Sequence, residues 1–150
     1  MADRGTEGSY KASEMNTNVE AEIERLRQQA LWGWDKELRN LQWFGLQDGM
    51  ALLEVGSGPG FITAQLLDTF PSLHVTCLEI DPEMVERAQS YLATKHSGRY
   101  EIVQGNVMDM PLADDSLDFA YAKSCSSSIC PTRWARCERY AAFLSPAASW

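Results

Sequence analysis

Residues 50–60 read Met-Ala-Leu-Leu-Glu-Val-Gly-Ser-Gly-Pro-Gly, and this stretch decides the fold. Its first part, residues 50–55, is a short apolar run without polar alternation, which is typical of a strand buried on both faces. Residues 56–60 are rich in glycine, and residues 61–70 then carry apolar side chains at helical spacing. The order of strand, glycine loop and helix predicts a loop whose backbone turns tightly and approaches a ligand closely.

The alternation of strands and helices continues along the chain. Further strands are predicted at residues 73–78, 100–103 and 117–122, and Asp81-Pro82 opens a helix between the first two of them. Strands that alternate with helices form a parallel sheet with right-handed crossovers. On the other side of the glycine loop, residues 1–19 are polar and are expected to be disordered, whereas helical spacing begins at Glu20 and predicts helices ahead of the sheet.

The composition excludes several classes of protein. The 150 residues are 45% hydrophobic, which suits one globular domain, and the formal net charge is -8. Without an apolar run of about 18 residues, a membrane span is excluded. The acidic balance argues against a nucleic-acid partner, and four unevenly spaced cysteines indicate neither a disulfide framework nor a metal site. We therefore expect a cytoplasmic protein with no metal, no membrane and no nucleic acid among its partners.

The glycine loop is compatible with two kinds of cofactor. A dinucleotide fingerprint, G-x-G-x-x-G, would need its third glycine at position 61, which is Phe61. Glu54 also stands two residues before the first glycine, where a carboxylate would repel a pyrophosphate at the helix N-terminus and would attract a cationic ligand. The sequence therefore disfavours a nicotinamide dinucleotide.

Three blocks of sequence resemble those of the class I S-adenosylmethionine-dependent methyltransferases. Residues 52–60 are similar to the first motif of that family, residues 78–84 to its second-strand motif, and residues 105–118 to its third block. The resemblance covers residues 20–122. It implies an α/β fold, a Rossmann-like doubly wound parallel sheet preceded by helices, of which this partial domain would hold the N-terminal half with strand order 3-2-1-4.

The resemblance also implies a function and a set of site residues. The function is methyl transfer from S-adenosylmethionine to a small-molecule acceptor, as in the quinone-biosynthesis methyltransferases. In the family the glycine loop passes under the methionine part, the acid after the second strand holds both ribose hydroxyls, and the third block contacts adenine. The cofactor-binding residues implied in this way are Glu54, Gly56, Ser57, Gly58, Gly60, Glu79, Ile80, Asn106 and Val107. Asn106 suits a turn cap as well, and no catalytic base is identified.

Residues 123–150 form a tail that shows neither strand nor helix period. If each codon were read from the last base of one residue and the first two bases of the next, every Cys or Trp would become Leu, Val or Met. Every Tyr or Phe would also become apolar. Whatever codons are used, the shifted reading therefore has apolar residues at the positions of Cys130, Trp134, Cys137, Tyr140 and Phe143. These positions follow one another in steps of four, three, three and three, which is helical spacing.

We therefore predict that the tail is an out-of-frame reading of the domain. Without the remaining strands, the strand at residues 117–122 would be an exposed apolar edge. The alternative function is accordingly a truncated, catalytically inactive fragment that retains at most cofactor binding.

Overall fold

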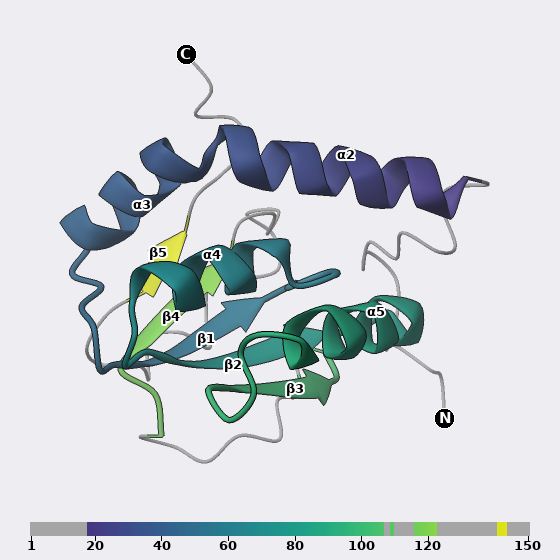
Figure 1. The fold of residues 1–150 in the computed structure, drawn as a ribbon. Helices are drawn as coiled ribbons and strands as arrows, with labels where there is room; N and C mark the ends of the chain where they lie inside the picture. Colours follow the sequence, from purple (N-terminus) through teal and green to yellow (C-terminus); the bar gives the residue numbers. More distant parts are fainter. Residues whose placement is uncertain (1–17, 107–108, 110–115, 123–140, 144–150) are drawn as a thin grey trace.

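A parallel β-sheet forms the centre of the molecule (Figure 1). The computed structural model describes residues 18–106, 109, 116–122 and 141–143. The strands are β1 (Ala51–Val55), β2 (His74–Glu79), β3 (Tyr100–Gln104), β4 (Phe119–Ala122) and β5 (Ala141–Phe143). They lie in the order β3-β2-β1-β4-β5, and every neighbouring pair is parallel. The predicted order 3-2-1-4 is confirmed, and β5 extends it.

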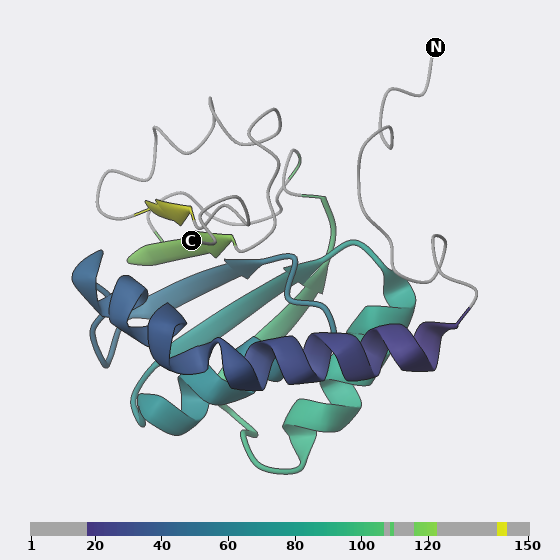
Figure 2. The ribbon, with the colours of Figure 1, turned by 90° about the horizontal axis from the view of Figure 1, so that it is seen from above.

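Four helices of the described chain lie on one side of the sheet (Figure 1): α2 (Val19–Trp32), α3 (Trp34–Trp43), α4 (Phe61–Thr69) and α5 (Pro82–Ala93). From β1 to β2 to β3 each new strand is added on the same side of the one before it in the sheet. The right-handed crossovers through α4 and α5 therefore pass over the same face. Seen from above, α2 runs across both of these helices (Figure 2). Within the described residues, no helix combines the length and apolar character that a membrane crossing needs.

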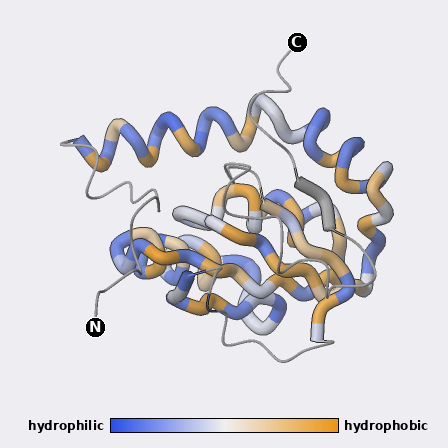
Figure 3. The backbone as a smooth tube through the Cα atoms, turned by 180° about the vertical axis from the view of Figure 1, so that it is seen from behind, coloured by the Kyte–Doolittle hydropathy of each residue, from blue (hydrophilic) through white to orange (hydrophobic). Residues whose placement is uncertain are grey.

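The core lies on both faces of the sheet, as the unbroken apolar strands predict. The face beneath the helices carries the larger cluster, in which Leu52 and Phe119 of the sheet pack with Leu41 of α3 and Leu66 of α4. The opposite face holds a smaller cluster around Leu53. Hydrophobic residues accordingly gather along the strands, whereas α2 alternates between hydrophilic and hydrophobic segments (Figure 3).

Strand β5 overturns the expectation for the edge of the sheet. It pairs with β4, with Ala120 opposite Ala141 and Ala122 opposite Phe143. All four residues of β4 are at most 2% exposed. The prediction that β4 is an exposed edge is therefore wrong, because a short strand from the tail satisfies its backbone groups.

The two predicted irregular ends lie mostly outside the described residues. In the tail these are residues 123–140 and 144–150, and at the N-terminus they are residues 1–17. The prediction that residues 1–19 are disordered extends slightly too far along the chain. Helix α2 already includes Val19, and the Asn18 side chain caps it by accepting a hydrogen bond from the Ala21 N–H at 3.1 Å.

Arg99 ties the end of α4 to the loop before β3. Its guanidinium donates to the carbonyl oxygens of Leu67 at 2.9 Å, Phe70 at 3.0 Å and Pro71 at 3.2 Å. Carbonyl groups at a helix C-terminus lack intrahelical partners, and a cation is favoured there. We therefore predict that Arg99→Met lowers the free energy of unfolding, measured in urea, by about 2 kcal/mol.

A neighbouring cation supplies the control for this prediction. Lys95 forms an ion pair with Asp68 at 2.7 Å, and its side chain is 68% exposed. Because exposed ion pairs contribute little, Lys95→Met should change the free energy of unfolding by less than about 0.5 kcal/mol. Equal losses in the two variants would contradict the role assigned to Arg99.

Candidate functional site

The carboxyl ends of β1, β2 and β3 bring most of the predicted site residues to one edge of the sheet. The N–H groups of Gly56 and Ser57 donate to the Leu78 carbonyl at 2.8 and 3.3 Å, and the Gly105 N–H donates to the Glu79 carbonyl at 2.9 Å. The loops after β1 and β3 are thus bonded directly to the end of β2. Ligands of open α/β sheets bind at this edge.

The three glycines of the loop after β1 have different roles. Gly56, Gly58 and Gly60 all have left-handed φ angles, of 69°, 56° and 86°. A Cβ added to Gly56 or Gly58 would meet no described atom within 4 Å, so these two positions border open space that a ligand can approach. A Cβ at Gly60 would lie 3.2 Å from the Leu92 side chain, so the structure gives this glycine a packing role between α4 and α5.

A cavity of about 90 Å³ lies between the glycine loop and α2. Its lining from the loop side includes Glu54, Gly56, Ser57 and Gly58, and its lining from α2 consists of Leu26, Gln29 and Ala30. Ser57 is 6% exposed, and its hydroxyl has no hydrogen-bond partner among the described residues. Buried hydroxyls are normally paired. A polar group of a ligand in this cavity would therefore supply a partner for Ser57.

Glu79 connects the glycine loop to the end of β2. Its Oε2 accepts from the Gly58 N–H at 2.7 Å, and its Oε1 accepts from the N–H groups of Ile80 at 2.9 Å and Asp81 at 3.0 Å. Burial raises the pKa of Glu79, and the three N–H donors offset part of this effect because they favour the charged form. An ionised carboxylate accepts up to about four hydrogen bonds, so Glu79 retains capacity for a hydroxyl of a ligand.

Glu54 lies beneath the loop, on the face of the sheet that the helices cover. It is buried, and its Oε2 accepts from the Thr63 hydroxyl of α4 at 2.5 Å. In the sheet it stands between Cys77 of β2 and Tyr121 of β4. The Tyr121 hydroxyl donates in turn to the carboxylate of Glu37 on α3. Glu54 therefore belongs to a buried polar row that crosses the sheet.

Neither Glu37 nor Tyr121 stands out in the sequence as a site residue. They are 84 residues apart in the chain. The one local signal was a carboxylate on the apolar side of a helix, since Glu37 precedes the buried Leu41 by one turn. That signal acquires meaning only when β4 is known to lie beside β1.

The residues expected on the adenine side are only partly described. Ile80 is half-buried next to Glu79, and Asn106 follows β3, with its carbonyl accepting from the Asp109 N–H at 3.0 Å. This bond is made by the Asn106 backbone and involves neither of the two uses predicted for its side chain. Val107 lies outside the described residues. In the described part of the chain, no group of three His, Cys, Asp or Glu side chains could hold a metal ion.

Comparison with known proteins identifies the family. A family model described as a methyltransferase domain matches residues 52–147, more than half of the chain. The chain belongs to this family. It is a class I S-adenosylmethionine-dependent methyltransferase domain. The predicted resemblance to this family is therefore confirmed, and the comparisons do not favour a nicotinamide-dinucleotide protein. The match continues past Ala122, where the resemblance was expected to end.

Curated relatives of this methyltransferase domain cover about half of the chain. It is 37% identical over 79 residues to a ubiquinone/menaquinone biosynthesis C-methyltransferase of Paracoccus denitrificans, covering 52% of this chain and 32% of the relative. It is 38% identical over 79 residues to a sterol 24-C-methyltransferase of Gibberella zeae, covering 52% of this chain and 20% of the relative. The chain therefore spans about a third or less of the length of these relatives.

Solved structures share the fold of this methyltransferase domain. An S-adenosylmethionine-dependent methyltransferase from Aquifex aeolicus has a TM-score of 0.59 at 24% identity, covering 76% of this chain and 57% of that one. A phosphoethanolamine N-methyltransferase of Haemonchus contortus, in complex with S-adenosyl-L-methionine, has a TM-score of 0.60 at 22% identity, covering 75% of this chain and 26% of that one.

Proposed function

We propose that this chain binds S-adenosylmethionine at the carboxyl ends of β1, β2 and β3 and serves methyl transfer to a small-molecule acceptor in the cytoplasm. One observation carries the proposal: the open side of Gly58, the carboxylate of Glu79 and a Ser57 hydroxyl with no partner in the described part of the chain lie around one loop. The relatives named for quinone biosynthesis and for sterols support a small acceptor.

Each part of the cofactor has residues that suit it. The loop of Gly56, Ser57 and Gly58 would hold the methionine part, with Glu54 beneath it, and Glu79 would accept from a ribose hydroxyl. Ile80, Asn106 and Val107 would border adenine. The cofactor supplies a methyl group activated on a sulfonium, and the protein's part is to align the reactants and to exclude water.

Calorimetric titration with S-adenosylhomocysteine tests the proposal directly. We expect saturable binding of one molecule per chain, and no change in the fluorescence of reduced nicotinamide dinucleotide when it is added to the same protein. A folded chain that binds neither S-adenosylmethionine nor S-adenosylhomocysteine would overturn the proposal.

The binding of S-adenosylhomocysteine should strengthen as pH rises. The raised pKa of Glu79 means that its carboxyl stays protonated above the usual Glu value of about 4.3 in the free protein. Hydroxyl donors favour the ionised form, so binding lowers this pKa and releases a proton. Affinity is therefore weakest below the pKa values of both the free and the bound protein, and it increases as pH rises through the pKa of Glu79 in the free protein.

Calorimetry in buffers of different ionisation enthalpy measures the released proton, and Glu79→Gln should remove the pH dependence. A pH-independent affinity in the parent protein would contradict the prediction.

We also propose, as the second candidate, that residues 123–150 are read out of frame and that the chain is catalytically inactive. The proposal is supported by the positions from Cys130 to Phe143 that become apolar in the shifted frame whatever codons are used. Two findings oppose it, because both belong to the amino-acid sequence as given and not to the shifted reading: the family model matches through residue 147, and residues 141–143 form strand β5. The nucleotide sequence is the test. We expect an open alternative frame that encodes a Pro-Gly-Gly turn, and a stop codon in that frame soon after codon 122 would overturn the proposal.

A further inference from the structure

A buried hydrogen bond joins the helical layer to the sheet. Glu37 on α3 is 8% exposed, Tyr121 on β4 is 1% exposed, and the tyrosine hydroxyl donates to the carboxylate. Burial raises the pKa of Tyr121, so the hydroxyl remains a donor at neutral pH. Removing a carboxylate from water is costly unless it is paired, and the bond to Tyr121 offsets this cost only while α3 lies against β4.

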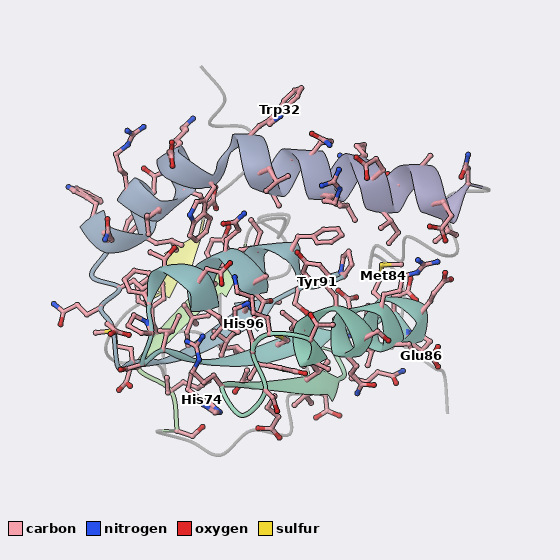
Figure 4. The ribbon with its side chains drawn as sticks, viewed as in Figure 1. Trp32, His74, Met84, Glu86, Tyr91 and His96 are labelled. Carbon is pink, nitrogen blue, oxygen red and sulfur yellow. The ribbon has the colours of Figure 1, made fainter. Side chains whose placement is uncertain are left out.

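Helix α3 follows α2 directly and, together with the packing of α2 on α4, determines where α2 lies. A single residue, Gly33, separates the two helices, and it is both the C-cap of α2 and the N-cap of α3. The aromatic side chain at the end of α2 does not hold this junction, because Trp32 points away from the sheet and is 86% exposed (Figure 4). At its other end, α2 has an ion pair between Glu20 and Arg87 at 2.6 Å, in which the Glu20 side chain is 76% exposed. Such a pair contributes little.

The position of α2 matters because this helix closes the cavity over the glycine loop. Its residues Leu26, Gln29 and Ala30 face the loop side of the cavity, whereas neither Glu37 nor Tyr121 lines it. Tyr121 is also the register neighbour of Glu54, which does line the cavity. The bond between Glu37 and Tyr121 therefore does not touch the cavity itself. It is linked to the cavity through α2, which is joined to α3 across Gly33, and through Glu54, which is the register neighbour of Tyr121.

We propose that Glu37 and Tyr121 are positioning residues for the cofactor site. Their hydrogen bond seats α3 on β4 and so holds α2 over the glycine loop before the cofactor arrives. A lid that is already in place does not have to be ordered on binding, which increases affinity. The inference rests on the proposed function, since it assigns the cavity between α2 and the loop to the methionine part of the cofactor.

The first test removes the hydroxyl alone. Tyr121→Phe should weaken the binding of S-adenosylhomocysteine about tenfold and should speed amide hydrogen exchange in α2 and α3, with α4 and β2 unchanged. Tyr100→Phe is the matched control, because it makes the same substitution on β3 at the far side of the sheet. The control should change neither the affinity nor the exchange.

A second pair of variants separates positioning from a direct effect of charge. Glu37→Gln keeps an acceptor oxygen for the Tyr121 hydroxyl and should bind nearly as well as the parent, whereas Glu37→Leu should bind as poorly as Tyr121→Phe. If Glu37→Gln is as weak as Glu37→Leu, the charge acts on the ligand and the proposal is overturned. If Tyr121→Phe does not fold, the comparison of Glu37→Leu with Glu37→Gln tests the proposal in its place.

The exchange measurement separates this proposal from the proposed function. If the parent protein binds no S-adenosylhomocysteine, the proposed function fails. Unliganded Tyr121→Phe still reports whether α2 and α3 are released. If the parent binds and Tyr121→Phe binds equally well with unchanged exchange, the positioning role is overturned.

Discussion

Gly58→Val is expected to abolish the binding of S-adenosylhomocysteine. Gly58 has a φ of 56°, a left-handed conformation that is strained for a β-branched residue. The new side chain would project into the open space beside the loop, where the proposed site places the cofactor. Its strain would also disturb the bond from the Gly58 N–H to Glu79. Calorimetric titration should therefore detect no saturation at concentrations that saturate the parent protein.

Gly98→Val provides the matched control for this result. Gly98 has a φ of 85°, and a Cβ there would likewise meet nothing within 4 Å among the described residues. It lies in the turn before β3, at the amino end of that strand. Gly98→Val should lower the free energy of unfolding by about 1–3 kcal/mol through backbone strain and should bind the ligand normally. Normal binding by Gly58→Val would show that the loop does not approach the cofactor.

The second large effect is expected for Glu79→Ala, which should weaken the binding of S-adenosylhomocysteine by about 1.5–3 kcal/mol. The substitution removes a carboxylate that suits the ribose hydroxyls. It also leaves the N–H groups of Gly58, Ile80 and Asp81 without their shared acceptor, so the loop loses one of its hydrogen bonds to β2. The affinity should fall roughly ten- to a hundredfold in the same calorimetric titration.

Glu86→Ala is the control for Glu79→Ala. Glu86 is an exposed glutamate on α5 (Figure 4), and it does not line the cavity between the glycine loop and α2. Its removal changes the net charge by the same amount and should leave the affinity unchanged. If Glu79→Ala binds as tightly as the parent protein, the assignment of Glu79 to the ribose hydroxyls is wrong.

The sequence by itself determined the central part of the fold and the loop of the site. Unbroken apolar runs predicted buried parallel strands, and β2 was placed within one residue of its observed bounds. Asp81-Pro82 predicted the start of α5, since the Asp81 side chain accepts from the Glu83 N–H at 3.0 Å and Pro82 suits the first turn. The glycines and Glu79 could be proposed as site residues because the motifs that carry the family resemblance are each local in the chain.

Only the tertiary structure decided how distant residues meet. Gly60 packs on Leu92, the buried Ser57 hydroxyl has no partner among the described residues, β5 covers the edge of β4, and Tyr121 donates to Glu37. None of these follows from the spacing of nearby residues. The reason is physical: a local pattern records which face of an element is apolar, whereas a buried polar pair or a strand neighbour depends on which elements pack together. Glu37 and Tyr121 lie on segments that are separate in the chain, and the sheet order that places β4 beside β1 brings them into contact.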